Sequence, residues 1–165
     1  MRGGPEDANA ATLPSVSERF TSARLLAGPA ITYAALCSSG ILTHWVTTLN
    51  GTSETYGHFI SNFLMPLLHP SPHHLSIVVF DNAAPHAPGH AADQALHLAG
   101  AMGLRLPPYH PDLNPIELAF SVIKAYLIRE HEAFRQNPNG TIAAAMRSIT
   151  PAMATGWFRH CGYLY

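Results

Sequence analysis

Two acidic residues occupy positions from which side chains often do chemistry. Asp81 ends the apolar run "SIVVFD", and Glu117 falls in the first turn of a predicted helix that follows the proline-rich stretch "LPPYHPDLNP". In an open α/β sheet, functional sites form outside the carboxyl ends of the strands. A strand-end aspartate and a helix-start glutamate can therefore meet at one sheet edge. Two close carboxylates repel each other there unless a proton or a cation offsets their charge.

Local chemistry alone also allows a simpler interpretation of both acids. An Asp-Asn pair after a strand is common in Asx turns. In "NPIE", Asn114 suits a helix N-cap, Pro115 the first helical position and Glu117 the reciprocal partner in a capping box. The two acids would then only shape turns, so the choice depends on the rest of the chain.

The elements around these acids predict a mixed α/β sheet with helices on its faces. Residues 30–50 hold two β-type runs around "SSG", which is a hairpin signal. Residues 75–81 form a short apolar run typical of a strand buried on both faces, and "LRL" at 104–106 is a second short strand. Helical patterns cover residues 53–68, 88–103, 115–134 and 140–163. In the first, Ser53 is the expected N-cap and Pro66 lies near the end. The second is expected to stop at Gly103, and the last to break near Pro151.

Length and composition favour some classes of protein and exclude others. The chain has 165 residues, 47% of them hydrophobic, which suits one compact domain. No apolar run approaches the roughly 20 residues that span a bilayer, and the N-terminal segment has no apolar core of a secretory signal. The two cysteines, Cys37 and Cys161, lie far apart and indicate structural thiols rather than a disulfide framework. A net charge of −1 gives no general electrostatic footprint for nucleic acid.

Two segments together resemble the catalytic core of mariner-type DDE transposases, which have an RNase H-like fold. In "VVFDNAAPH", Asp81, Asn82 and His86 match a strand that ends in Asp-Asn and is followed by a nearby histidine. In the second segment, the family's Leu-Pro-Pro-Tyr-Ser-Pro-x-Leu-Asn-Pro-Ile-Glu is matched by Leu106, Pro107, Pro108, Tyr109, Pro111, Leu113, Asn114, Pro115, Ile116 and Glu117, with His110 in place of the usual serine. Phe120, Lys124 and the ending "GWFRHCGY" extend the resemblance over about residues 30–163.

This resemblance implies a metal-dependent reaction on DNA. Asp81 and Glu117 would be catalytic and would bind Mg²⁺ or Mn²⁺, because hard cations prefer oxygen ligands and two metal ions clamp the attacking and leaving oxygens. Asn82, His86 and Lys124 would contact DNA. The implied reaction hydrolyses a strand at a transposon end, and the freed 3′-hydroxyl then attacks target DNA. DNA is the expected partner, a dimer is left open and no membrane is involved; the expected compartment is the nucleus in a eukaryote and otherwise the cytoplasm.

The sequence departs from the family at its first acid. The family's first aspartate ends a strand that precedes the hairpin, but the upstream acids Glu6, Asp7 and Glu18 do not end an apolar run. We therefore expect a disordered leader over 1–27 and a partial catalytic domain over 28–165. Its central first strand would be missing, leaving open sheet edges unless another segment fills the gap. The expected protein is an N-terminally truncated, inactive copy, or alternatively a non-catalytic remnant that binds nucleic acid or protein.

Two other groups of side chains allow more than one interpretation. The histidines near the 88–103 helix lack the cysteine or acidic spacing of a zinc site: His86, His90 and His97. The basic residues after Glu117 either form a DNA-facing strip along its helix or a solvated helix face: Lys124, Arg129 and Arg135.

Overall fold

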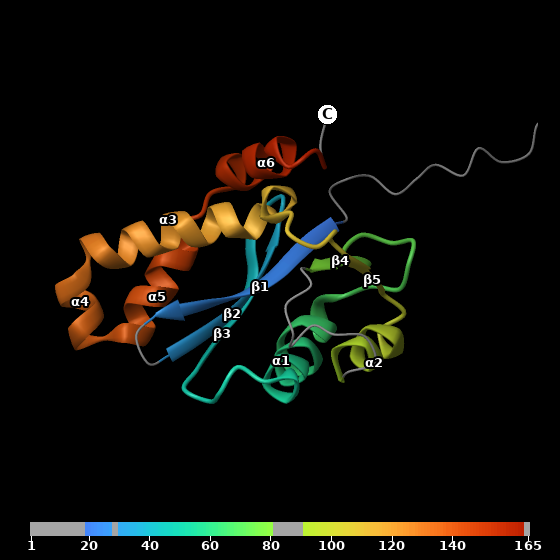
Figure 1. Ribbon diagram of the computed structural model, residues 1–165, viewed down its shortest axis with the longest axis horizontal. Coiled ribbons are helices and arrows are strands. Elements are labelled where there is room, and N and C mark those ends of the chain that lie inside the picture. Colours follow the sequence, from blue (N-terminus) through green and yellow to red (C-terminus); the bar gives the residue numbers. More distant parts are fainter. Residues whose placement is uncertain (1–18, 28–29, 81–90, 164–165) are drawn as a thin grey trace, which may run out of the picture.

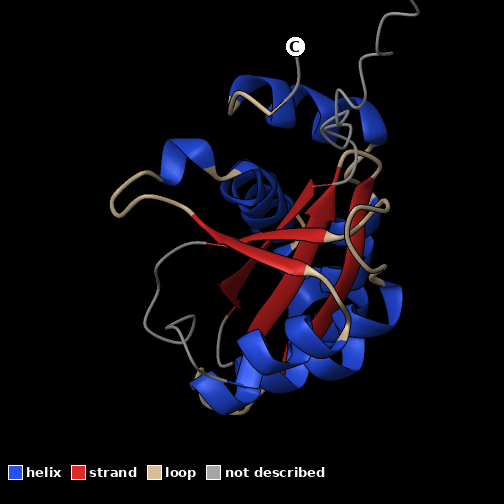
Figure 2. Ribbon diagram, turned by 90° about the vertical axis from the view of Figure 1, so that its right-hand side faces the viewer, coloured by secondary structure: helices blue, strands red, loops and turns tan. Residues whose placement is uncertain are grey.

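The protein forms one mixed sheet with helices on both faces (Figures 1 and 2). The computed structural model describes residues 19–27, by their backbone alone, together with 30–80 and 91–163. Its five strands lie in the order β3-β2-β1-β4-β5. They are β1 (Arg19–Ala27), β2 (Ala30–Cys37), β3 (Gly40–Thr47), β4 (Ile77–Phe80) and β5 (Met102–Arg105). Strands β1, β2 and β3 are antiparallel neighbours, and β4 runs parallel to both β1 and β5. The predicted mixed α/β sheet is confirmed.

The centre of the sheet, predicted to lack a strand, is filled by β1. This strand pairs with β2 from Thr21–Leu36 to Ala27–Ala30 on one side, and with β4 from Arg19–Ile77 to Ser22–Phe80 on the other. The predictions of a missing strand and of a leader without structure up to residue 27 are therefore wrong for 19–27. Pairing on both sides satisfies two rows of backbone groups that a gap would leave open, and this outweighs a weak local strand pattern. Residues 1–18 lie outside the described part of the chain.

The predicted hairpin is present as β2 and β3. The chain turns at Ser38–Ser39 and enters β3 through Gly40, whose φ of 122° suits a residue without a Cβ. Along β2, alternate residues face opposite core clusters. Tyr33 packs with the helices that follow β3, whereas Ala34 packs with the helices of the C-terminal half. The sheet is therefore buried on both faces.

The helices between β3 and β5 cover one face of the sheet. Helix α1 (Ser53–Phe59) continues through a π-helical turn (Ile60–Leu64) and a 3-10 turn (Met65–Leu67) that contains Pro66, where the helix was expected to end. Its N-cap is Thr52 rather than Ser53, because the Thr52 and Thr55 hydroxyls and backbone amides form a reciprocal capping box. Tyr56 and Phe59 of this helix are buried in one core cluster with Tyr33 of β2.

Helix α2 (Ala91–Leu98) ends earlier than predicted. Gly100, with a φ of 68°, takes the left-handed position after the helix, and Gly103 belongs to β5. A Cβ at Gly103 would lie 3.1 Å from the Phe80 ring and 3.3 Å from Leu96, so this glycine permits close packing of β5. Periodicity alone could not distinguish the two glycines.

The C-terminal helices cover the opposite face. They are α3 (Pro115–Arg129), α4 (His131–Gln136), α5 (Pro138–Arg147) and α6 (Pro151–His160). The buried stripe of α3 packs with α5 and α6 over β2, as the core residues Ile116, Phe120, Ile123, Ile142 and Phe158 show. The predicted break near Pro151 is confirmed, since α6 starts there. Within the described residues, no helix is long and apolar enough to cross a membrane.

Candidate active site

The candidate site lies at the carboxyl end of β4. Strand β4 is buried and ends at Phe80, the residue before Asp81. Phe80 has Ser22 of β1 on one side and Arg105 of β5 on the other, and all three strands run in the same direction. The Leu106 amide donates to the Phe80 carbonyl at 2.9 Å, so the chain leaving β5 stays beside this strand end. Asp81, Asn82 and His86 lie outside the described residues, and their predicted roles stay predictions.

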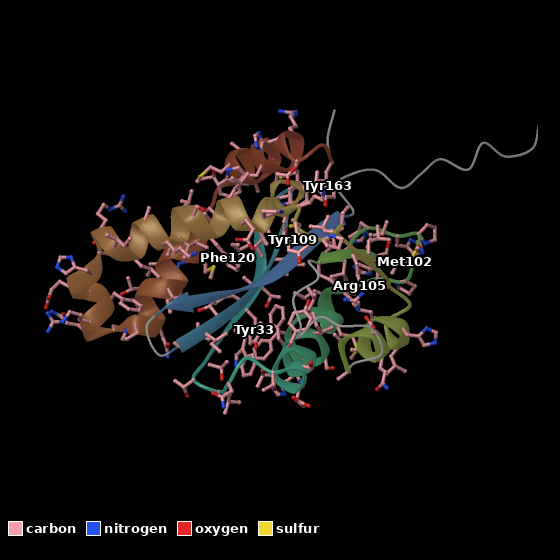
Figure 3. All side chains as sticks on the ribbon, in the orientation of Figure 1. Tyr33, Met102, Arg105, Tyr109, Phe120 and Tyr163 are labelled. Carbon is pink, nitrogen blue, oxygen red and sulfur yellow. The ribbon has the colours of Figure 1, made fainter. Side chains whose placement is uncertain are left out.

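The proline-rich loop connects β5, which lies beside the end of β4, to α3. It turns at Pro108–Tyr109, makes a 3-10 turn over Pro111–Leu113 and enters the helix. At its far end, the Tyr163 hydroxyl donates to the Leu113 carbonyl at 2.9 Å. Leu113 and Tyr163 also pack on Ile77, Val79 and Leu106. The loop is therefore held at both ends, and Figure 3 shows Tyr109 and Tyr163 from the two segments near the start of α3.

Helix α3 begins as predicted, but without the predicted capping box. Asn114 is the N-cap and Pro115 the first helical residue, and the Glu117 amide donates to the Asn114 carbonyl at 3.1 Å. The Asn114 side chain makes no capping hydrogen bond, and its buried Oδ1 has no hydrogen-bond partner. The box, which needs that oxygen as an acceptor, is therefore not formed. Asn114 and Pro115 explain where the helix starts, but a capping box does not explain why residue 114 is an asparagine and residue 117 a glutamate.

Glu117 is placed by the packing of α3. The neighbouring Ile116 and Phe120 are buried in the core and fix the rotation of the helix, and this leaves the Glu117 side chain half-buried on the first turn. A carboxylate there interacts favourably with the helix dipole. The predicted aromatic position, Phe120, is thus a core residue. Lys124 lies two turns further along and is exposed, and no contact tests its predicted role in binding DNA.

Arg105 supplies a basic group at the same sheet edge, which the sequence analysis did not single out. Its guanidinium lies 4.6 Å from the centre of the Phe80 ring, and its Nη2 lies 3.1 Å and 3.3 Å from the two carboxylate oxygens of Asp93. Figure 3 shows Arg105 at the end of β5. A lone arginine in a short strand carries no local signal of such contacts, because they depend on neighbours brought together by the fold.

The described residues do not by themselves form a metal site. Among them, no group of three or more His, Cys, Asp or Glu side chains is arranged to hold a metal ion. Glu117 is the described member of the predicted pair. The nine residues of β1, "RFTSARLLA", include no acid, so the strand that fills the central place brings no carboxylate. Of the histidines weighed for zinc, His97 is exposed on α2, whereas His86 and His90 lie outside the described residues.

The other predicted basic residues do not form one strip. Arg129, the last residue of α3, pairs with Glu130 at 2.9 Å and lies over the Tyr126 ring. Arg135 belongs to the separate helix α4 and lies 3.8 Å from Glu132. The interpretation as a solvated helix face is favoured for both arginines.

Comparison with known proteins decides the family. The family model described as DDE superfamily endonuclease matches residues 27–138, more than half of the chain. The chain belongs to the DDE superfamily endonucleases. This confirms the relationship that the Asp-Asn and proline-rich motifs predict. No curated protein matches the sequence.

Solved structures confirm the RNase H-like fold of this DDE domain. The catalytic core domain of BIV integrase aligns with a TM-score of 0.60 and 16% identity, covering 89% of this chain and 99% of that one. The Mos1 transposase catalytic domain, solved with raltegravir and Mn, aligns with a TM-score of 0.69 and 14% identity, covering 88% and 78%. A chain of the simian T-cell lymphotropic virus intasome in complex with the PP2A regulatory subunit B56 gamma gives a TM-score of 0.59 and 14% identity, covering 88% and 52%.

Proposed function

We propose that this DDE domain acts on DNA through a metal site whose ligands are Asp81 and Glu117. The observation that carries the proposal is the position of Glu117. It lies half-buried in the first turn of α3, at the end of a loop that begins beside Phe80, the residue before Asp81. Carboxylate oxygens suit Mg²⁺ or Mn²⁺, and the ion would also offset their mutual repulsion. A complete site of this kind would perform phosphoryl transfer on DNA, as strand cleavage and strand transfer.

The composition of β1 favours a second candidate, a DDE domain that binds DNA or protein without cutting DNA. Two-metal phosphoryl transfer relies on ligands that position both ions and stabilise charge on the attacking and leaving oxygens. β1 occupies the place next to β4 and contains no acid. We therefore expect the chain to hold one ion weakly and to cut DNA at no measurable rate. Asn82, His86 and Lys124 remain the proposed DNA contacts, with transposon ends and target DNA as the proposed partners and dimerisation left open.

Nicking of supercoiled plasmid in Mg²⁺ or Mn²⁺ separates the two candidates. We expect no nicking by the unmodified chain. Metal-dependent nicking that disappears in both Asp81→Ala and Glu117→Ala would instead establish a complete active site.

Calorimetric titration with Mn²⁺ tests the metal site without relying on cleavage. Weak binding of one ion is expected, and it should disappear in each of the two variants. Asp112→Ala, which removes an exposed carboxylate of the same loop, should leave binding unchanged. Binding that survives both site variants would contradict the assignment of Asp81 and Glu117.

A further inference from the structure

Tyr109 combines two features that are rarely found together. Its backbone is in the left-handed region, with a φ of 62°, and its side chain is fully exposed, with 100% of its surface accessible. For a bulky residue the left-handed conformation is an outlier, because the Cβ crowds the following carbonyl oxygen. Glycine or asparagine would take this turn position at lower cost.

Packing among the described residues gives no reason for a tyrosine at this position. A fully exposed ring is not part of the core, and it contributes no buried area that would offset the backbone strain. Strained residues that persist in a structure often mark a functional position. The ring of Tyr109 is therefore accessible to a binding partner, and its strained backbone makes it a candidate for a functional position.

The loop holds this ring at the edge of the candidate site. Pro107 and Pro108 restrict the backbone directly before Tyr109. The loop begins at Leu106, whose amide is bonded to the Phe80 carbonyl, and its other end is held by the bond from Tyr163 to the Leu113 carbonyl. Tyr109 thus lies in a short, anchored turn of the loop from β5, which pairs with the end of β4, to the helix of Glu117.

We propose that Tyr109 is a stacking platform for an unpaired base of the DNA strand bound at this site. The anchored loop limits the movement of the backbone that carries this exposed ring, and any base offers a π-face for stacking. Bases inside a duplex have both faces covered by their neighbours, whereas the bases of an overhang can leave the stack and lie on the ring, so the expected ligand is a DNA end with an overhang. This proposal rests on one part of the proposed function, that the chain binds DNA. It requires neither a bound metal ion nor cleavage of DNA.

The test measures binding of DNA to the full chain in low salt with EDTA present. One probe is a duplex with a short 3′ overhang that contains 2-aminopurine, and the other is the blunt duplex of the same paired sequence. The unmodified chain should bind the overhang more tightly and quench the 2-aminopurine fluorescence. Tyr109→Asn, which suits the left-handed backbone, should weaken overhang binding about tenfold or more and leave blunt binding unchanged.

Further variants separate stacking from other roles of the residue. Tyr109→Trp should retain the overhang preference, because it keeps a ring and loses only the hydroxyl. The matched control Ile128→Asn removes an exposed apolar side chain from α3, 74% accessible, and should change neither probe. Asp81→Ala and Glu117→Ala should keep the preference, so failure of the metal site would be distinguishable from failure of this proposal.

Stability distinguishes a binding role from a structural one. Thermal melting of Tyr109→Asn should occur at the same temperature as that of the unmodified chain or higher, since asparagine relieves the strained turn. A clear fall in the melting temperature would indicate that the ring supports the fold and would overturn the proposal. So would equal binding of the two probes by the unmodified chain, or an overhang preference that persists in Tyr109→Asn.

Discussion

The guanidinium of Arg105 lies over the ring of Phe80, 4.6 Å from its centre, and connects the ends of β5 and β4. The same guanidinium is bound by the carboxylate of Asp93 on α2. One side chain therefore joins two strands and a helix next to the residue that leads into Asp81. These contacts of Arg105 stabilise the ends of β4 and β5 next to the candidate site.

Replacing Arg105 should destabilise the protein more than replacing a more exposed arginine with the same kinds of contact. Arg105→Met is expected to lower the free energy of unfolding by about 1–2 kcal/mol, because a partly buried cation-π contact and a charged hydrogen bond are lost. Arg129, which also lies over a ring and pairs with a carboxylate, has a side chain 69% accessible against 23% for Arg105. Arg129→Met should cost less than about 0.5 kcal/mol. Urea unfolding measures both, and equal losses would contradict the role assigned to Arg105.

Restoring a carboxylate to β1 should create nicking activity. Ser22 of β1 pairs with Phe80, the last residue of β4. Ala23 is the next residue of β1, and Asp81 is the next residue of the sequence after Phe80. Ala23 also lies opposite Ala34, whose side chain packs in the core cluster of α3. We therefore expect Ala23→Asp to supply the missing acid on the side of the sheet where Glu117 lies. The measurement is metal-dependent plasmid nicking above the level of the unmodified chain.

Two controls keep that result specific. Ala23→Asn has a similar shape without the charge and should remain inactive. Combining Ala23→Asp with Glu117→Gln should abolish any nicking gained. Activity in the combined variant would show that the new carboxylate acts outside the proposed site.

Two asparagines that each precede a proline at a helix start should respond differently to removal of the side chain. Asn137 Oδ1 accepts from the Gly140 amide at 3.0 Å and caps α5, so Asn137→Ala is expected to cost about 1 kcal/mol. Asn114 caps nothing with its side chain, and its buried oxygen is unpaired. Asn114→Ala should therefore cost less, because relief of an unsatisfied polar atom offsets lost packing. Denaturant unfolding measures the order of the two losses, and the reverse order would point to an unseen partner of Asn114.

His44 should make the protein less stable in mild acid. Burial, and to a lesser extent the nearby positive charge of Arg147, lower the pKa of His44 below its ordinary value of 6.5. As the pH falls below about 6.5, the unfolded chain takes up this proton before the folded protein does, so the free energy of unfolding decreases until the folded pKa is also passed. His44→Gln should remove this part of the pH dependence, measured by unfolding between about pH 5 and 8. His97 is exposed on α2, and His97→Gln serves as the control. It should leave the dependence of the free energy of unfolding on pH that is due to His44 unchanged.

Sequence patterns predicted the elements whose type is set by a local pattern of residues. The β2–β3 hairpin follows from two apolar runs around a glycine turn, and β4 from a continuous apolar run. Helix α3 starts at Pro115 because asparagine and proline suit a helix start, and its rotation follows from a buried stripe of apolar residues. The motif that starts α3, together with the Asp-Asn pair after β4, indicated the DDE family.

Helix ends and caps were predicted less well, because several residues compete for the same role. Thr52 caps α1 rather than Ser53, and Gly100 rather than Gly103 follows α2. Each candidate has suitable local chemistry. For α1, Thr52 is the cap because it forms a reciprocal capping box with Thr55. For α2, close packing of β5 against Phe80 requires Gly103 in the strand.

The sequence by itself determined the family, the helix that carries Glu117 and the strand that leads into Asp81, because these depend on short-range periodicity and local turn chemistry. Only the tertiary structure decided that Arg19–Ala27 fills the centre of the sheet, since its pairing on both sides depends on strands distant in sequence. It also decided that Arg105 lies over Phe80 and that Tyr109 is exposed in a strained turn. These contacts and this exposure depend on which segments the fold brings together, and on what those segments leave uncovered.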